Sequence, residues 1–117
     1  MKQEHAFSCQ VARYLRQSGM LTIDTDVMSA LRYLSPTDKR RFLYIKQHTL
    51  MGYTKGQPDL VIAYKGGVAF VELKAGKGKQ SAVQKLIQSQ FEKMGLNYMV
   101  WNKFSDAVKF VMETKRA

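Results

Sequence analysis

Helical periodicity recurs along most of the chain. Residues 3–18, 81–94 and 104–112 each place apolar side chains three and four positions apart, which predicts amphipathic helices. Two further helices are expected between the first two. One is capped by Asp24 or Thr25 and buries Val27, Met28, Leu31 and Leu34. The other begins with Ser35 as N-cap and Pro36 as first residue and ends near Gly52.

Continuous apolar runs mark the strands. LVIAY and VAFVEL flank Gly66-Gly67 and predict a buried β-hairpin with strands near 59–64 and 67–74. Shorter runs at 21–23 and 97–101 predict two more strands. Helices and strands in this order predict an α/β fold in which helices flank a small mixed β-sheet. The length of 117 residues suits one domain, residues 1–117.

Charged residues interrupt this hairpin at its open end. If Gly66-Gly67 is the loop, Asp59 faces Lys74, and Glu72 lies on the same face of the sheet. The backbones of the two acids would then be diagonal neighbours about 7–8 Å apart. A slip of one residue would move Asp59 to the opposite face, so this prediction depends on the register.

Two carboxylates this close repel each other unless a positive charge lies between them. Oxygen ligands favour Mg²⁺ or Mn²⁺ over zinc, and such an ion polarises a phosphate and activates a water. The Lys74 ammonium would orient that water or stabilise developing charge. Each of these residues taken singly is more typical of a solvated strand edge. Their combination predicts phosphodiester hydrolysis.

The composition indicates which class of molecule the chain binds. Lysine and arginine number 19 against 9 acids, a net charge of +10, which favours binding to nucleic acid. The apolar runs are too short to cross a bilayer and the N-terminus lacks a signal peptide, so we expect a cytoplasmic protein that does not bind membranes. Cys9 is the single cysteine, which excludes internal disulfides. Gln80 follows Gly78-Lys79 where a P-loop needs Ser or Thr, so no nucleotide cofactor is expected.

Three motifs together resemble a known nuclease family. Pro58-Asp59 and Glu72-Leu73-Lys74 resemble the PD-(D/E)xK signature. The wider motifs GQPDL at 56–60, ELK at 72–74 and SAVQ at 81–84 resemble the virus-type replication-repair nuclease (VRR-NUC) domain over about residues 52–101. Residues 22–51 contain no matching motif.

The resemblance implies a restriction-endonuclease-like fold and an Mg²⁺- or Mn²⁺-dependent DNA endonuclease. Stand-alone, phage-type members resemble Holliday-junction resolvases of DNA repair, which act as homodimers on four-way junctions. The corresponding location is the cytoplasm of a bacterium or of a phage-infected host. The alternative function is a non-catalytic, basic DNA-binding module of the same fold.

The same resemblance implies roles for single residues. Asp59, Glu72 and the backbone carbonyl of Leu73 would bind the metal, and Lys74 would serve the attacking water. Gln84 would support the site, although Ser81 and Gln84 also fit a capping box, and both roles stay open. Glu4 would reach the metal directly or through water; its alternative role is a favourable position in the first turn of a helix.

Basic residues near these motifs are candidates for phosphate contact. Lys55, Lys77 and Lys79 flank the predicted site. Arg40 and Arg41 belong to a basic run at the start of a helix, for which a solvated face is the alternative to DNA contact.

Overall fold

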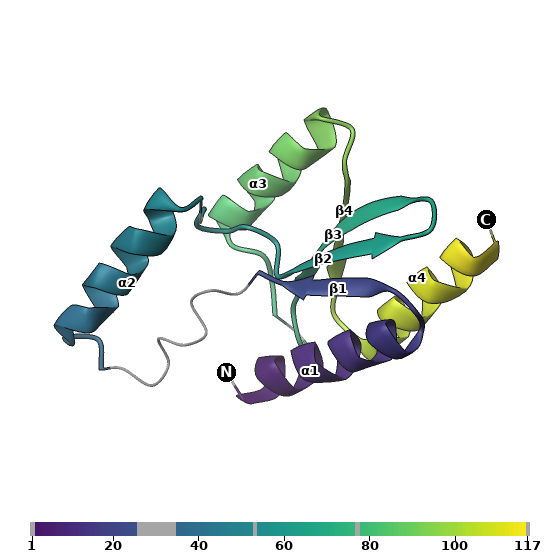
Figure 1. Ribbon diagram of the computed structural model, residues 1–117, viewed down its shortest axis with the longest axis horizontal. Coiled ribbons are helices and arrows are strands. Elements are labelled where there is room, and N and C mark those ends of the chain that lie inside the picture. Colours follow the sequence, from purple (N-terminus) through teal and green to yellow (C-terminus); the bar gives the residue numbers. More distant parts are fainter. Residues whose placement is uncertain (1, 26–34, 53, 77, 117) are drawn as a thin grey trace.

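The computed structural model describes residues 2–25, 35–52, 54–76 and 78–116, with no side chains described for 2–5 and 116. These ranges form four helices and four strands (Figure 1). In chain order they are α1 (Lys2–Gln17), β1 (Leu21–Asp24), α2 (Lys39–Leu50), β2 (Leu60–Tyr64), β3 (Gly67–Leu73), α3 (Ala82–Lys93), β4 (Asn97–Trp101) and α4 (Phe104–Arg116). The predicted α/β fold is confirmed. The helix expected to bury Val27 and Leu31 falls on 26–34, outside the described residues.

The four strands form one mixed sheet in the order β1-β2-β3-β4. The pairs β1–β2 and β2–β3 are antiparallel, whereas β4 is parallel to β3. A parallel pair needs a long crossover connection, and α3 supplies it between β3 and β4. None of the helices in the described ranges is long and apolar enough to cross a membrane.

The hairpin turns one residue earlier than the sequence pattern predicts. Tyr64 pairs with Gly67, so the two-residue loop is Lys65-Gly66 and the predicted loop Gly66-Gly67 is wrong. Gly66 has a φ of 114°, which glycine adopts at little cost because it has no Cβ.

This turn shifts the pairing by two residues. Val61 pairs with Phe70 instead of Glu72. Asp59 lies just before β2, and continuing the register places it opposite Glu72 instead of Lys74. The predicted register is therefore wrong, but an even shift leaves every side chain on its predicted face because side chains alternate with a period of two.

The two faces of the sheet are covered differently. Helices α1 and α4 pack on one face and form the main hydrophobic core with the inward residues of the strands, among them Leu15, Ile62, Val71, Trp101 and Phe110. Helix α3 lies on the other face, where Phe91 contacts Phe70 of β3 and Tyr98 of β4 with ring centroids 4.8 and 5.5 Å away. Glu72 follows Phe70 by two residues and shares the face of α3.

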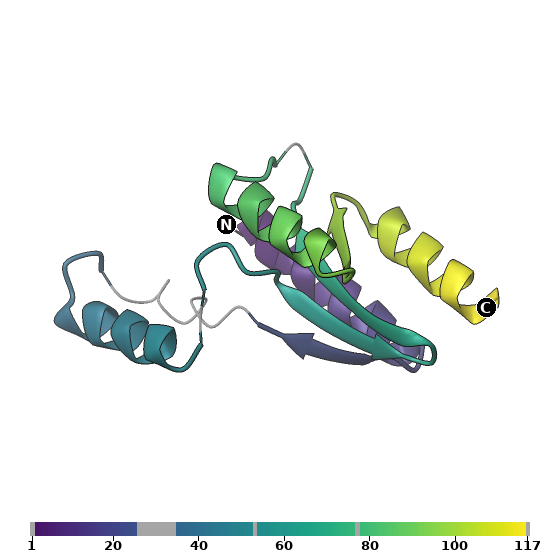
Figure 2. The same cartoon turned by 90° about the horizontal axis from the view of Figure 1, so that it is seen from above.

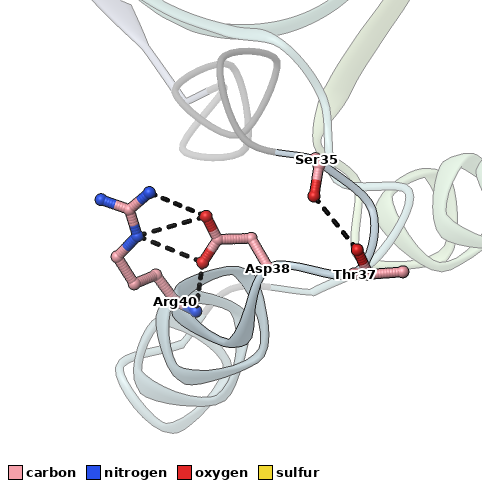
Figure 3. Close-up of polar contacts among 4 residues, drawn as sticks. All are labelled: Ser35, Thr37, Asp38 and Arg40. Carbon is pink, nitrogen blue, oxygen red and sulfur yellow. Dashed lines mark hydrogen bonds and ion pairs between the residues drawn. The ribbon is translucent and has the colours of Figure 1, made fainter.

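Helix α2 lies apart from the sheet and the other helices in both views (Figures 1 and 2). It begins after Asp38. The Asp38 carboxylate accepts a hydrogen bond from the Arg40 amide at 2.9 Å and forms an ion pair with the Arg40 guanidinium at 2.7 Å (Figure 3). The predicted N-cap Ser35 is wrong, because the helix begins at Lys39 and Asp38 is its N-cap. The Ser35 hydroxyl lies outside the helix, 3.2 Å from the Thr37 hydroxyl. A charged cap therefore replaces the neutral one that the sequence suggests.

Candidate active site at the end of the β2–β3 hairpin

The GQPD loop is tied to the end of β1. Gln57 donates from Nε2 to the Thr25 carbonyl at 2.9 Å and accepts from the Thr54 amide at 3.0 Å. The Thr25 amide donates to the Asp59 carbonyl at 2.9 Å, and the Thr25 hydroxyl donates to the Pro58 carbonyl. These contacts fix the backbone that carries Asp59 before β2 begins.

Gly56 brings the same loop against the start of α3. Its φ is 85°, and a Cβ at this position would lie 2.8 Å from Val83 Cγ1 and 3.3 Å from the Gln84 amide nitrogen. Real Cβ atoms do not approach other atoms so closely, so a side chain at residue 56 would push the loop away from α3. The glycine of the GQPD motif is thus required both for its backbone conformation and for its close approach.

Asp59 is oriented by the backbone of β3. Its Oδ2 accepts a hydrogen bond from the Leu73 amide at 2.8 Å. The amide of the next residue, Lys74, points to the opposite edge of β3 and donates to the Trp101 carbonyl of β4 at 2.8 Å. In a strand the N–H and C=O of one residue point to the same edge, so we expect the Leu73 carbonyl on the edge beside Asp59.

Glu72 is completely buried, with 0% of its surface exposed. Its Oε2 accepts a hydrogen bond from Gln80 Nε2 at 2.9 Å and a long one from the Tyr98 hydroxyl at 3.4 Å. Burial, and then the charge of Glu72, raise the pKa of Tyr98 well above its ordinary value, so the hydroxyl keeps the proton that it donates. Gln80 Nε2 is also within 3.0 Å of Gln88 Oε1 on α3, which holds the amide in place.

Lys74 is half-buried directly after β3. Strand alternation places its side chain on the same face as Glu72, as the sequence predicts. Its aliphatic stem lies close to the Gly78 backbone. A Cβ at residue 78 would be only 3.5 Å from Lys74 Cβ. Asp59, Glu72 and Lys74 thus lie on one face at the same end of the hairpin.

Gln84 has its side chain in the capping box of α3. Its Oε1 accepts from the Ser81 amide at 2.8 Å, and its own amide donates to the Ser81 hydroxyl at 3.2 Å. The capping role is confirmed. The glutamine that contacts Glu72 is Gln80, which the sequence did not single out. No sequence signal identifies it, because the contact arises where the loop after β3 folds back.

The remaining predicted residues lie around the site or away from it. Lys55 and Lys79 are exposed in the loops on either side. Arg40 is held by Asp38 on α2, and Arg41 is half-buried on the same helix. Lys77 and the side chain of Glu4 fall outside the described residues.

The donor set suits a hard cation with an open coordination sphere. Within the part of the chain that is described, no group of three or more His, Cys, Asp or Glu residues could hold a metal. The oxygen ligands on offer would be the carboxylates of Asp59 and Glu72 and the backbone carbonyl of Leu73. Mg²⁺ accepts such an incomplete set because it keeps several water ligands. A carboxylate as buried as Glu72 is stabilised by hydrogen bonds and by nearby positive charge, so the residues fit such an ion.

Comparison with known proteins bears on the fold. The sequence matches no protein-family profile and no curated protein. It is similar to a solved structure described as "VRR_NUC domain", with a TM-score of 0.63 and 21% identity over 94% of this chain and 95% of the other. A second, "VRR_NUC domain protein", has a TM-score of 0.61 and 17% identity over 95% and 86% of the two chains. The chain therefore has the fold of a VRR-NUC domain, a restriction-endonuclease-like arrangement.

Proposed function

We propose that this chain is a metal-dependent DNA endonuclease that hydrolyses phosphodiester bonds. The observation that supports the proposal is that the strand register puts Asp59, Glu72 and Lys74 on one face at the same end of the hairpin, and that each carboxylate accepts a hydrogen bond. The net charge of +10 and the VRR-NUC fold support the same conclusion.

Asp59, Glu72 and the Leu73 carbonyl would hold Mg²⁺ or Mn²⁺. When bound, such an ion supplies Lewis-acid polarisation of the phosphate and a more acidic water. The Leu73 amide keeps the Asp59 carboxylate turned toward this edge, and Gln80 keeps one oxygen of Glu72 engaged so that the side chain stays in one orientation. Fixing ligands before the ion arrives lowers the ordering cost of binding.

Lys74 would act through its charge on the attacking water and the phosphate. Its ammonium, carried on a stem that packs beside Gly78, would orient the attacking water and stabilise negative charge that develops on the phosphoryl oxygens. We assign it this electrostatic role and no role as general base. Lys55 and Lys79, exposed on either side, would bind the flanking phosphates.

We further propose that the substrate is branched DNA, such as a four-way junction, and that the enzyme acts as a homodimer in the cytoplasm of a bacterium or phage-infected cell. A four-way junction has two-fold symmetry, so a two-fold dimer would present one site to each of two equivalent strands. The similarity of the motifs to stand-alone VRR-NUC proteins supports this choice.

A cleavage assay tests the proposal. Supercoiled plasmid, linear duplex, flap and four-way-junction DNA are incubated with Mg²⁺, Mn²⁺ or EDTA. We expect cleavage only with metal and fastest on the junction, reduced at least about 100-fold in Asp59→Asn and Lys74→Ala while junction binding persists. Lys109→Ala on α4, an exposed lysine on the opposite side of the sheet, is the control and should cleave normally.

Two results would overturn the assignment. Unchanged cleavage by both site variants would remove these residues from the chemistry. Junction binding without cleavage under every ion would favour the non-catalytic DNA-binding module instead.

A further inference from the structure

Positive charge is concentrated in the part of the chain that includes α2. Residues 39–58 contain five lysines and arginines and neither aspartate nor glutamate, so about a sixth of the chain carries half of its net charge of +10. Three of the five form the run Lys39-Arg40-Arg41 in the first turn of α2, where the helix dipole disfavours positive charge. The run therefore does not serve the stability of the helix, and its charges suit a negatively charged partner.

One side of α2 alternates basic and apolar side chains. Lys39, Phe42, Leu43, Lys46 and Leu50 are three or four positions apart, so they form one continuous strip along the helix. We call these five residues the α2 strip. All five are exposed, and the apolar members Phe42, Leu43 and Leu50 are exposed by 70%, 61% and 80%. The strip thus presents both ammonium groups and bulky apolar groups to solvent.

The segment that carries α2 leaves and rejoins the fold beside the candidate active site. Gln57 donates to the Thr25 carbonyl at 2.9 Å, which joins the two ends of this segment. The Thr25 amide in turn donates to the Asp59 carbonyl at 2.9 Å. In both views α2 lies beyond the end of the sheet at which β1 ends and β2 begins (Figures 1 and 2). A DNA strand that is held at the site and continues past this end of the sheet would run toward α2.

We propose that α2 recognises the branch point of DNA: Lys39 and Lys46 bind phosphates, and Phe42 and Leu43 between them contact exposed base faces. The two lysines are about 10 Å apart along the axis, because each residue of a helix rises about 1.5 Å. This separation is close to three phosphate steps of about 3.4 Å along one strand. The choice of DNA as partner rests on the proposed nuclease function, whereas the base-contacting strip goes beyond it.

Apolar side chains gain from DNA only where base faces are accessible. In a regular duplex the faces are stacked, so a phenyl ring reaches them only by unstacking a base step, which is costly. At a flap, a single strand or an open junction the bases are already unstacked, and stacking on an aromatic ring then strengthens binding. The α2 strip would therefore favour branched over linear DNA. Phosphate contacts alone give no such preference, because both kinds of DNA offer phosphates.

A membrane or a protein partner suits the α2 strip less well. A helix that lies in a membrane surface needs a continuous apolar face with its charges on the other side, whereas Lys46 lies between Phe42 and Leu50 in one row. The buried parts of protein interfaces are depleted of lysine, and Lys39 and Lys46 would be buried there with their apolar neighbours. Phosphates on either side of an exposed base match both kinds of side chain.

Binding of the full chain to fluorescent DNA in EDTA tests the proposal without cleavage. The variant Phe42→Ala/Leu43→Ala retains good helix formers. It should weaken binding to flap, open-junction and single-stranded DNA at least about 5-fold and binding to linear duplex less than about 2-fold. Phe42→Trp should keep the preference for branched DNA, because an indole ring also stacks. Met112→Ala, on an α4 residue that is 51% exposed, is the control and should bind every DNA as the wild type does.

Charge variants test the phosphate contacts of the α2 strip separately. Lys39→Ala/Lys46→Ala should weaken binding to linear and branched DNA alike, and should reduce the slope of log K against log [salt] by about two. Lys109→Ala/Lys115→Ala removes the same charge from exposed positions of α4 and should change neither quantity.

A 2-aminopurine base at the branch point reports the base contact directly. Its fluorescence should change when the wild-type chain binds, and should change much less with Phe42→Ala. Three results would each overturn the proposal: equal losses of linear and branched DNA binding in Phe42→Ala/Leu43→Ala, no loss in that variant, or a probe signal that does not depend on Phe42. Binding to anionic phospholipid vesicles that this variant abolishes, with DNA binding intact, would assign α2 to a membrane surface instead.

Failure of the α2 strip and failure of the nuclease are distinguishable. A chain that prefers branched DNA through the strip but cleaves none under any ion would retain the strip and lose the nuclease function. A chain that cleaves DNA with metal while both strip variants bind as the wild type does would retain the nuclease function and lose the strip.

Discussion

Two glutamines four residues apart have different environments. Gln80 contacts the buried Glu72, whereas Gln84, the one that the motif points to, caps α3. The motif Ser-x-x-Gln explains the capping contact from local spacing alone. The Gln80 contact needs the loop after β3 to return over the sheet, which local spacing does not encode.

We expect Gln80→Leu to weaken Mn²⁺ binding about 10-fold, because groups that orient metal ligands affect affinity to this degree. Calorimetric titration of the full chain with MnCl₂ measures the effect without relying on turnover. Gln84→Leu is the control: it should lower the free energy of unfolding by about 0.5–1 kcal/mol and leave Mn²⁺ affinity unchanged. Equal affinities of the two variants would contradict the orienting role of Gln80.

Gly56→Ala should destabilise the fold more than Gly19→Ala. Both glycines have positive φ, 85° and 86°, so alanine is strained at each by about 1 kcal/mol. A Cβ at Gly19 meets nothing within 4 Å, whereas one at Gly56 would overlap Val83 Cγ1. Urea unfolding of both variants separates backbone strain from the overlap. Equal losses would show that the loop moves away from α3 freely.

At the scale of elements, helix α2 depends on its cap. Asp38 accepts hydrogen bonds from the Arg40 side chain and then from its amide, and these contacts lower the pKa of Asp38 from 3.8 to about 2. A carboxyl whose pKa is lower in the folded state stabilises that state while it is ionised. The contribution is therefore complete above about pH 4 and is lost as the pH falls toward 2.

NMR titration of the Asp38 carboxyl tests this prediction. Its midpoint should lie below the ordinary aspartate value, and the α2 amides should lose protection across the same interval. Asp38→Ala should remove this pH dependence and reduce helical content, whereas Thr37→Ala, just outside the helix, should do neither. A midpoint at the ordinary value would mean that the Arg40 contact does not form in solution.

Most elements could be predicted because their signals are local. Apolar spacing predicted β4 at its observed bounds, and α3 lies within the predicted range 81–94. The hairpin loop could not be predicted, since Gly66-Gly67 and Lys65-Gly66 both place a glycine in the turn. The observed pairing of β2 with β3 distinguishes them.

At the scale of the whole molecule, the excess of basic residues should make DNA binding strongly dependent on salt. Each phosphate contact releases condensed counterions, so log K falls with log [salt] by about 0.9 per contact. The double variant Lys55→Ala/Lys79→Ala should reduce the slope for junction DNA by about two.

Fluorescence anisotropy at several KCl concentrations measures this slope, and Lys109→Ala on α4 should leave it unchanged. A slope near zero for the wild-type chain would mean that the net charge does not form a DNA-binding surface.

The sequence by itself determined the order of the helices and strands that the structure describes, and the face on which Asp59, Glu72 and Lys74 lie. These features follow from periodicities of two and 3.6 residues, which are properties of neighbouring positions. Only the tertiary structure decided the register of the hairpin, the complete burial of Glu72, and the donors that hold the two acids. Those donors are 8, 14 and 26 residues from the acceptors in the chain. Contacts over such separations depend on how the loop after β3 and strand β4 return to the sheet, which local patterns do not specify.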